Sequence, residues 1–271
     1  MRSGATPLEP PSLHTILPPV MITLGIDVGG TFTDLVMRDS RTGELRSLKT
    51  PTTPPTYADG VMNAIGRTGA APDAIADIAH GMTVATNTAL EMNGAKLGVI
   101  TTRGFRDVLV VGRGNRTALY DIKAVRPPPL VPRARILEVD ERMTASGEVH
   151  KPLDAAQVAM AAKRLSEMAV EAVAVCFLHS YANPEHERRA AEIVSQAMPG
   201  VPVSVSSDIL PEYREFERFS TTALNAYVGP KVSQYLDRLA SSLTDQNIEA
   251  PLRIMGSNGG TWSAAAMAAE P

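Results

Sequence analysis

The stretch from Gly25 to Asp34, GIDVGGTFTD, constrains the fold of this chain more than any other. An apolar run delivers Asp27 to the glycine pair Gly29-Gly30. In a dinucleotide-binding unit or a P-loop, such glycines open a helix. Here the following TFTDLVMRD is rich in Thr, Phe and Val and ends in the turn signal DSRTGEL. The pattern therefore predicts the tip of a β-hairpin, with a second hairpin after it.

The turn at the centre of this stretch carries groups that suit an anion. Gly29 and Gly30 can adopt positive φ and bring backbone N–H groups close to a phosphate, and Thr31 and Thr33 add hydroxyl donors. Asp27 is placed to hold Mg²⁺ through water or to orient an attacking water. A carboxylate beside a phosphate is repulsive unless a cation lies between them, which is a hint of metal. The alternative is a hairpin turn that Asp and Gly stabilise without any ligand.

The second half of the chain has an α/β pattern. Helices are predicted over 155–168 and 184–198, and the buried strands EAVAVCFLH and VPVSVSSDI lie on either side of the second helix. Two buried strands that flank one helix indicate a parallel βαβ crossover. A mostly helical stretch over 212–243 follows, and we expect Gly229-Pro230 to break or kink it.

These patterns predict three segments. Residues 1–20 are Pro-rich and are expected to lie outside the fold, with Met21 as an alternative start of translation. Residues 21–205 are expected to form the first domain, and 206–271 the truncated beginning of a second one. The turn SNGG follows a strand close to the end of the sequence and predicts more chain.

Charge and composition exclude several classes of partner. Lys plus Arg number 26 against 29 for Asp plus Glu, a formal charge of −3, so neither nucleic acid nor an anionic membrane is expected as a partner. No apolar run reaches the roughly 20 residues that span a bilayer. The single cysteine, Cys176, lies in an apolar run and is interpreted as a small buried hydrophobe. A chain without an intramolecular disulfide suits a reducing compartment, and we predict a cytoplasmic protein.

The opening stretch resembles the first phosphate-binding hairpin of the actin, sugar-kinase and chaperone ATPase superfamily. Further segments narrow the resemblance to the hydantoinase A / 5-oxoprolinase family, in the same order along the chain. These segments are HGMTVATNTALE, GVITTRGFRDVLVVGRGNR, LYDI, VDERMTASGEV, AVAVCFLHSYANPEHE, STTALNAYVGP and MGSNGG. The resemblance implies an α/β fold of the ribonuclease H-like, actin/hexokinase type. Such a fold has a mixed sheet with N-terminal β-hairpins, here followed by the start of a second α/β domain.

The same resemblance implies ATP-dependent hydrolytic opening of a cyclic amide of the hydantoin or 5-oxoproline type. ATP and Mg²⁺ are the implied cofactors, and a hydantoinase B-type subunit in an oligomer is the implied partner. Two alternatives stay open. One is a subunit of an ATP-dependent acetone or acetophenone carboxylase, and the other is an inactive fragment or an assembly module.

Carried onto this sequence, the resemblance implies a set of site residues. The predicted catalytic residues are Asp27 and His80, with Asp27 also at the metal; the phosphate-binding residues are Gly29, Gly30, Thr31 and Thr33; the substrate-side residues are Thr83, Thr86, Asn87 and Arg113. For His80 a structural role is an equal alternative, for Thr83 an ordinary helix N-cap, and for Arg113 a solvated surface position. A metal site at His179 and His186 is weaker than the initiation of a surface helix at Asn183-Pro184.

This sequence departs from the family pattern in two ways. The family usually has His-Gly-Thr-Thr where this chain has His80-Gly81-Met82-Thr83, so one hydroxyl is missing. Family members are also much longer and carry a second glycine-rich hairpin after the SNGG turn. Because the superfamily clamps its nucleotide between two domains, we expect the chain alone to be inactive.

Overall fold

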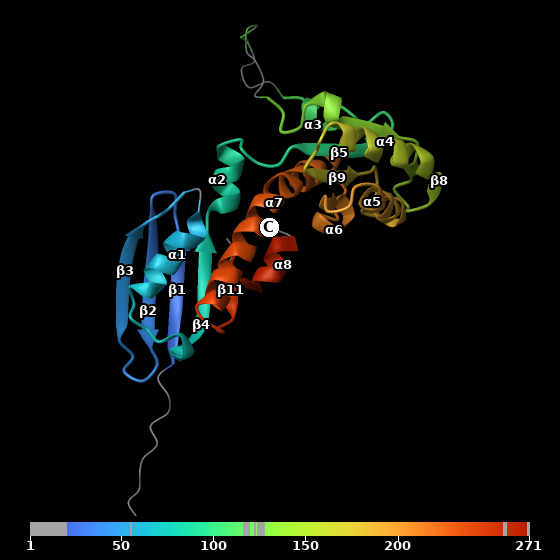
Figure 1. The fold of residues 1–271 in the computed structure, drawn as a ribbon. Helices are drawn as coiled ribbons and strands as arrows, with labels where there is room; N and C mark the ends of the chain where they lie inside the picture. The colour runs from blue at the N-terminus through green and yellow to red at the C-terminus, as the bar shows by residue number, and fades with distance from the viewer. Residues whose placement is uncertain are drawn as a thin grey trace, which may run out of the picture.

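The computed structural model describes residues 21–54, 56–115, 120–121, 123, 128–256 and 259–269, so the predicted extension at 1–20 lies outside the described residues. Two main sheets are connected by α2 and by the long helix α7 (Figure 1). The helices are α1 (Tyr57–Gly66), α2 (Val84–Leu90), α3 (Val108–Val111), α4 (Ala155–Glu167), α5 (Glu185–Ala197), α6 (Ser206–Ile209), α7 (Glu215–Asp245) and α8 (Ala264–Ala269), with 3₁₀ turns at Pro72–Ala74 and Arg133–Arg135. Within the described part of the chain, no helix has both the length and the apolar character that crossing a membrane requires.

The first sheet, called the hairpin sheet below, has the strand order β12-β11-β4-β1-β2-β3. Its strands are β1 (Ile22–Val28), β2 (Phe32–Asp39), β3 (Leu45–Pro51), β4 (Ile75–Met82), β11 (Leu252–Met255) and β12 (Thr261–Ser263). β1 pairs with β2, and β2 with β3, in antiparallel fashion, which confirms the two predicted hairpins. β1 pairs in parallel with β4, and β4 with β11, so the sheet is mixed.

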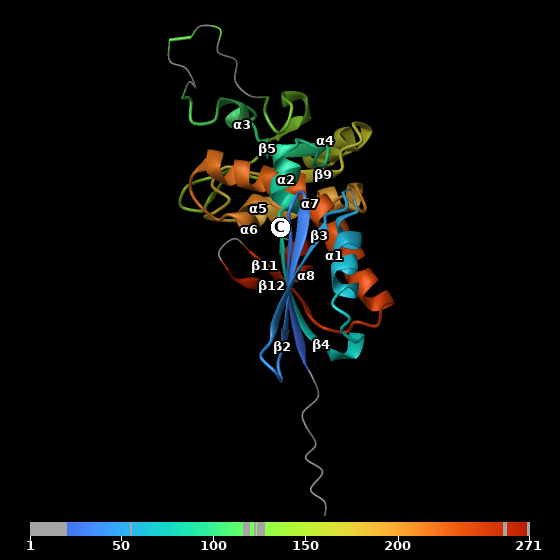
Figure 2. The ribbon, with the colours of Figure 1, turned by 90° about the vertical axis from the view of Figure 1, so that its left-hand side faces the viewer.

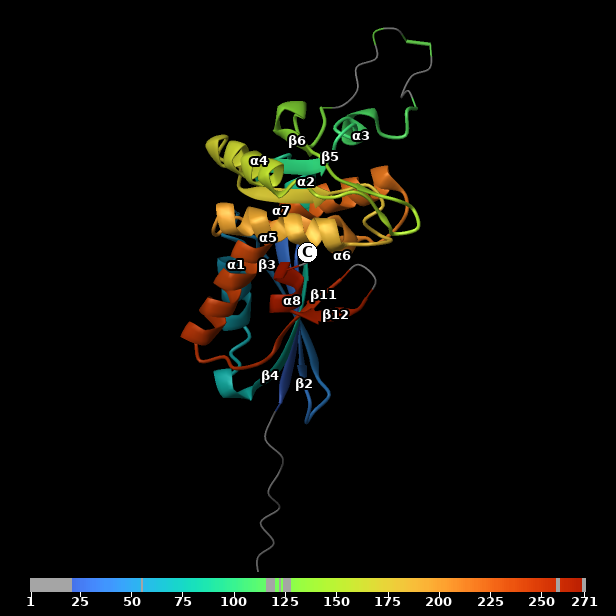
Figure 3. The same ribbon diagram turned by 90° about the vertical axis from the view of Figure 1, so that its right-hand side faces the viewer.

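Alternation along β1 and β2 decides which face of the hairpin sheet is buried. Leu24, Ile26 and Leu35 contribute to a core under α1 and the second half of α7, whereas Asp27 and Asp34 are exposed on the other face. Figures 2 and 3 show this sheet nearly edge-on, with α1 and that part of α7 on the same side of it. A strand that is covered on one side only needs this period of two.

The second sheet, called the parallel sheet below, has the order β10-β9-β5-β6 and lies between β4 and β11 in the chain. Its strands are β5 (Leu97–Thr102), β6 (Ile136–Val139), β9 (Ala172–Cys176) and β10 (Val203–Val205). All three pairings are parallel, which confirms the predicted crossover through α5. Helices α4 and α5 cover one face and the first half of α7 the other. β9 is therefore buried along its whole length and reads as the unbroken apolar run AVAVC.

A small antiparallel pair and the short strand β10 complete the part of the molecule around the parallel sheet. β7 (Arg142–Met143) and β8 (Val149–Lys151) pair around a turn in which Gly147 has φ 85°. β10 is shorter than expected, because the buried Glu187 carboxylate accepts hydrogen bonds from the Ser206 hydroxyl (2.7 Å) and the Ser207 amide (2.8 Å). These bonds draw the chain out of the extended conformation and into α6.

Helix α7 excludes one of the two outcomes that we expect at Gly229-Pro230, a break of the helix. Gly229-Pro230 does not end the helix, which continues through Pro230 over its 31 residues. The buried residues before Pro230, such as Phe219 and Tyr227, pack on the parallel sheet. Those after it, such as Leu236 and Leu239, pack on the hairpin sheet. Burial on both sides of the proline maintains the helix although one backbone donor is missing.

The strand pairing crosses the domain boundary that we expect between residues 205 and 206. β11 and β12, from the second predicted segment, extend the sheet that the first segment begins. α7 in turn packs on both sheets. The division into 21–205 and 206–271 stays a prediction about sequence units.

The packing of α7 gives a test of this architecture at Gly94. A Cβ there would lie 2.4 Å from a Tyr227 ring carbon and 2.6 Å from the Tyr227 carbonyl oxygen. Gly94→Ala should therefore lower the free energy of unfolding by about 1–3 kcal/mol, measured by urea denaturation. The control is Gly66→Ala, because nothing lies within 4 Å of its Cβ position. It should be neutral or stabilising by up to roughly 1 kcal/mol. Equal destabilisation in the two variants would contradict this packing.

Candidate functional site

Asp27 lies in β1 close to the strand's C-terminal end, with its side chain exposed and its carboxylate beside Gly81 of β4. Asp27 pairs in register with Gly81 of β4. A Cβ on Gly81 would lie 3.0 Å from Asp27 Oδ1, so the glycine leaves the room that the carboxylate occupies. In the described part of the chain the carboxylate forms no hydrogen bond or ion pair. It is therefore available to a cation or a water molecule.

The turn after β1 presents backbone donors to solvent. The Gly29 amide donates to the Phe32 carbonyl at 3.0 Å and closes the turn. The next two amides, of Gly30 and Thr31, find no acceptor among the described residues, and both residues are exposed. Two successive unpaired N–H groups at a turn form the kind of concavity that binds anions.

The glycines of this turn do not use the conformational freedom that we expect from the sequence. Neither Gly29 nor Gly30 has a positive φ. Gly29 is required for space instead, because a Cβ there would lie 3.1 Å from the Phe32 carbonyl oxygen. At Gly30 the position of a Cβ is open, with Asn87 Nδ2 at 3.9 Å.

Thr33 does not lie where a phosphate could reach it. Its side chain is fully buried and its hydroxyl is 3.2 Å from that of Thr52. Thr52 donates to the Gly29 carbonyl at 2.9 Å and its amide donates to the Thr31 carbonyl at 2.9 Å. Thr33 and Thr52 thus hold the turn from its buried side, whereas Thr31 is exposed at the tip.

Helix α2 begins beside the turn and brings three predicted residues with it. Thr83 occupies the N-cap position, but its hydroxyl accepts no backbone N–H of the helix, so the ordinary N-cap interpretation is wrong. The hydroxyl instead donates to the Val28 carbonyl at 3.1 Å. Asn87 Nδ2 donates to Thr83 Oγ1 at 3.3 Å and is the side chain nearest to Gly30. Thr86 faces away from Asn87 and lines a hollow of about 550 Å³ together with residues of α7 such as Leu224.

His80 is fully buried between the hairpin sheet and the second half of α7. Its Nδ1 faces the Ile26 carbonyl at 3.3 Å and its Nε2 faces the Tyr235 hydroxyl at 2.6 Å. Since a carbonyl only accepts, Nδ1 carries the proton and Nε2 accepts from Tyr235. Burial lowers the pKa of His80 to about 4, so the ring is neutral near pH 7. With both nitrogens engaged, His80 joins β1, β4 and α7.

Arg113 lies apart from the turn, just after α3 and beside the parallel sheet (Figure 1). Its guanidinium forms an ion pair with Glu217 of α7, with a shortest N···O distance of 2.6 Å. The structure therefore brings Asp27, Gly30, Thr31, Thr83 and Asn87 together and leaves Arg113 elsewhere.

The remaining candidates from the sequence have structural partners. His186 Nδ1 is 2.9 Å from Glu141 Oε2 in a buried pair, and His179 contacts Tyr181. No group of three or more potential metal ligands occurs among the described residues. Burial raises the pKa of the Cys176 thiol, as the interpretation as a buried hydrophobe predicts.

Two residues near Asp27, namely Asp34 and Gly81, are not among the site residues predicted from the sequence. Asp34 is directly opposite Asp27 in the β1–β2 register and pairs with Lys49 at 3.2 Å. Like charges opposite each other are unfavourable, so Lys49 offsets part of the repulsion. Gly81 appears in the sequence as one glycine among many, and only the parallel register of β1 and β4 shows what it accommodates. The DVGGTFTD spacing contains the signal for Asp34, because a tight hairpin sets its first and last residues opposite each other.

The fold and the turn together define a mixed α/β protein with an exposed hairpin turn whose Gly30 and Thr31 amides find no acceptor among the described residues. The family model of the hydantoinase/oxoprolinase N-terminal region matches residues 23–198, and the model of the hydantoinase/oxoprolinase region matches residues 218–271. The chain therefore belongs to the hydantoinase/oxoprolinase family. Homologues in this family include 5-oxoprolinase, caprolactamase and acetone carboxylase.

Individual relatives agree with this assignment. Over 88% of its length the chain is 41% identical to an uncharacterised protein of Methanocaldococcus jannaschii and covers 35% of that protein. It is 36% identical over 88% of its length to the alpha subunit of caprolactamase from Pseudomonas jessenii, of which it also covers 35%. Two solved structures superpose on it: nucleotide-free acetone carboxylase (TM-score 0.79, 30% identity, 92% of this chain and 38% of that one) and the ATP-dependent caprolactamase of Pseudomonas jessenii (0.78, 34%, 89% and 36%). The chain thus spans little more than a third of these relatives.

The pH dependence of the free energy of unfolding tests whether His80 is buried as a neutral ring. The folded pKa of about 4 lies below the ordinary value of 6.5, so the unfolded chain binds more protons between these values. The free energy of unfolding should therefore rise with pH in this window, by at most about 1.4 kcal/mol per pH unit from this residue. His80→Gln should remove that contribution, as urea unfolding of both proteins from about pH 4 to 7.5 will show. Parallel stability curves for the two proteins would contradict the buried neutral ring.

Proposed function

We propose that the turn between β1 and β2 binds the phosphates of ATP. The observation that carries this proposal is the pair of unpaired, exposed amides at Gly30 and Thr31, with the Thr31 hydroxyl beside them. Hydrogen bonds from such donors to a charged phosphate are about twice as strong as those between neutral groups. The same turn accepts the approach of a phosphate because Gly30 has no side chain.

Asp27 fits Mg²⁺ in this proposal. Mg²⁺ prefers oxygen ligands and is usually held by one or two carboxylates together with phosphate oxygens and water. Asp27 supplies one exposed carboxylate without a partner in the described chain, and the phosphates would supply further oxygens. When bound, the metal would neutralise charge between the carboxylate and the phosphates.

The fold supports a nucleotide-binding role. The strand order β3-β2-β1-β4-β11, with antiparallel hairpins and then parallel strands, is the order that we expect of a ribonuclease H-like domain of the actin and hexokinase type, and it supports that proposed assignment. In our proposal the chain supplies one side of the nucleotide site, and a second such domain supplies the other. His80 has a positioning role here, because its ring is buried and both its nitrogens are engaged.

The proposed reaction is ATP-dependent hydrolytic opening of a cyclic amide of the hydantoin or 5-oxoproline type. The amide of such a ring is stable because nitrogen is a poor leaving group. Transfer of a phosphoryl group from ATP to the amide oxygen, with release of ADP, makes the ring carbon electrophilic. Water adds to that carbon, the C–N bond breaks as a proton passes to nitrogen, and the resulting acyl phosphate is hydrolysed to a carboxylate and inorganic phosphate. The similarity to caprolactamase and 5-oxoprolinase supports this choice. Thr86, which lines the hollow between α2 and α7 described above, is our candidate for contact with the ring.

A ketone carboxylase is the second candidate, because the chain superposes on acetone carboxylase as well as on caprolactamase. The relatives' names identify several of them as subunits, which supports an assembly with a partner subunit. We propose that this partner is of the hydantoinase B type and that the complex is cytoplasmic. In a complex with that partner, ATP hydrolysis should rise when a lactam or 5-oxoproline is added. A rise only with a ketone and bicarbonate would favour the carboxylase, and no rise with either substrate would favour an inactive module.

The nucleotide site can be tested on this chain by calorimetric titration with Mg-ATP. Gly30→Val should block the approach of the phosphates to the turn amides, and Asp27→Ala should remove a ligand to the cation. Each variant should therefore weaken Mg-ATP binding on the order of tenfold or more. The control is Thr23→Val, which lies on the same strand and the same exposed face as Asp27. Undetectable binding by the unaltered chain, or equal affinity in all variants, would contradict the proposal.

A further inference from the structure

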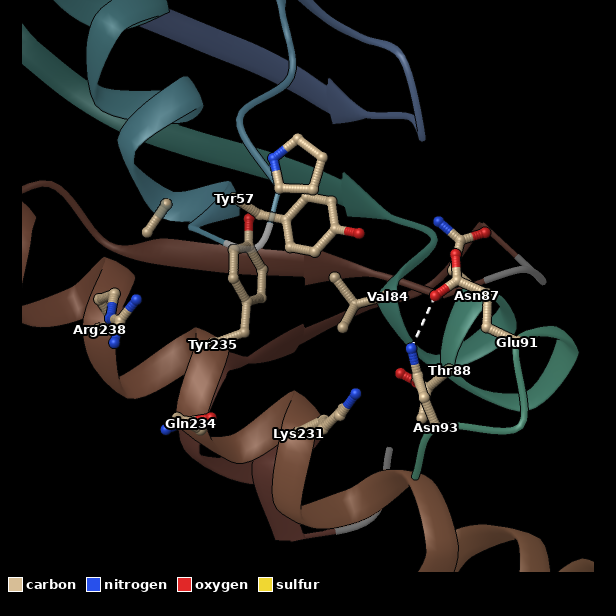
Figure 4. A pocket seen from close by; sticks show the side chains of 12 residues that line it. Tyr57, Val84, Asn87, Thr88, Glu91, Asn93, Lys231, Gln234, Tyr235 and Arg238 are labelled. Carbon is tan, nitrogen blue, oxygen red and sulfur yellow. Dashed lines mark hydrogen bonds between the residues drawn. The ribbon is translucent and has the colours of Figure 1, made fainter. Parts of the chain in front are cut away.

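A second hollow lies on the other side of Asn87, between α1, α2 and α7 (Figure 4). Its volume is about 280 Å³, near the lower end of the range of roughly 300–1,000 Å³ of small-molecule pockets. We call it the α2 pocket. Its lining comprises Pro54, Tyr57, Ala58, Val84, Asn87, Thr88, Glu91, Asn93, Lys231, Gln234, Tyr235 and Arg238.

One wall of the α2 pocket is cationic. Lys231 and Arg238 lie seven residues apart on α7, which places them on the same face of the helix, with Gln234 between them. In the described part of the chain neither cation has a carboxylate partner. Figure 4 shows the Lys231 amine directed into the hollow. A pair of unpaired cations at a concave surface favours a bound anion.

The lining around these cations includes apolar and aromatic side chains from α1, α2 and α7. The rings of Tyr57 and Tyr235 meet edge to face, with centroids 6.4 Å apart, and Val84 lies beside them. The Tyr235 hydroxyl is already engaged with His80 at 2.6 Å, so its ring offers an apolar surface to the pocket. A ligand for this site therefore has a hydrocarbon body as well as an anionic group.

The far end of the pocket carries the opposite charge. Glu91 is the single acidic residue of the lining, and its Oε2 accepts a hydrogen bond from Asn93 Nδ2 at 2.7 Å. Its carboxylate has no cationic partner among the described residues. Cations on one side and a carboxylate on another fit a ligand with both charges, and the carboxylate disfavours a multiply charged phosphate.

We propose that the α2 pocket binds a small amino acid, with its carboxylate at Lys231 and Arg238 and its ammonium at Glu91. The choice of ligand rests on the proposed function. When water opens a cyclic amide, the ring C–N bond breaks, the water oxygen joins the carbonyl carbon and a proton passes to nitrogen. The product therefore carries a carboxylate at one end and an amine at the other. Asn87 lines the pocket, and its Nδ2 would lie 3.9 Å from a Cβ at Gly30, so it stands between this site and the proposed nucleotide site.

The test uses the 271-residue chain without nucleotide and three probes. These are 6-aminohexanoate, which is the amino acid from caprolactam, hexanoate, and inorganic phosphate. NMR or calorimetric titration should show that 6-aminohexanoate binds more tightly than hexanoate and that both bind more tightly than phosphate. Lys231→Met should weaken both carboxylates on the order of tenfold or more, because a charge-assisted bond is lost. Glu91→Gln should remove the preference for the amine.

Lys163→Met, at an exposed position on α4, is the matched control and should leave all three affinities unchanged. Mg-ATP affinity should survive Lys231→Met, and carboxylate affinity should survive Gly30→Val. Absence of 6-aminohexanoate binding in a chain that binds Mg-ATP would overturn the pocket proposal alone. Phosphate binding as tight as that of the carboxylates, or full affinity in Lys231→Met, would overturn it as well. Loss of Mg-ATP binding with intact carboxylate binding would overturn only the nucleotide site.

Discussion

The pairing of β1 with β4 is the interaction on which the candidate site depends. Three contacts follow one another along this pair: His80 with the Ile26 carbonyl, Gly81 with the Asp27 carboxylate, and Thr83 with the Val28 carbonyl. The first is buried, the second leaves a carboxylate exposed, and the third fixes the start of α2. A parallel register alone therefore decides where the turn, the carboxylate and the helix stand relative to one another.

Local pattern predicts much of this fold. The glycine turn followed by TFTDLV is typical of a hairpin, and the alternation in β1 and β2 follows directly from burial on one face. The run AVAVC indicates a strand covered on both faces, and the structure confirms it. Asp27, Gly30 and Thr31 meet because they are near neighbours in the chain. Their proximity needs no information about distant segments.

Other features depend on contacts between distant segments, which no local pattern contains. Thr33 is covered by Thr52, which follows β3, and His80 by Tyr235, which follows 155 residues later. The return of β11 to the hairpin sheet is equally invisible in the sequence, because the whole parallel sheet separates it from β4. Arg113 is a polar residue in a glycine loop, and only the fold reveals its partner, Glu217.

The proline within α7 has a mechanical consequence. Without an amide hydrogen, Pro230 cannot bond to the Ala226 carbonyl, so the helix has one missing hydrogen bond between its two buried stretches. The residues on either side are each fixed to a different sheet. Bending at this point would change the angle between the sheets while both cores stay intact. A change in the angle between the hairpin sheet and the parallel sheet would therefore pivot at Pro230 of α7.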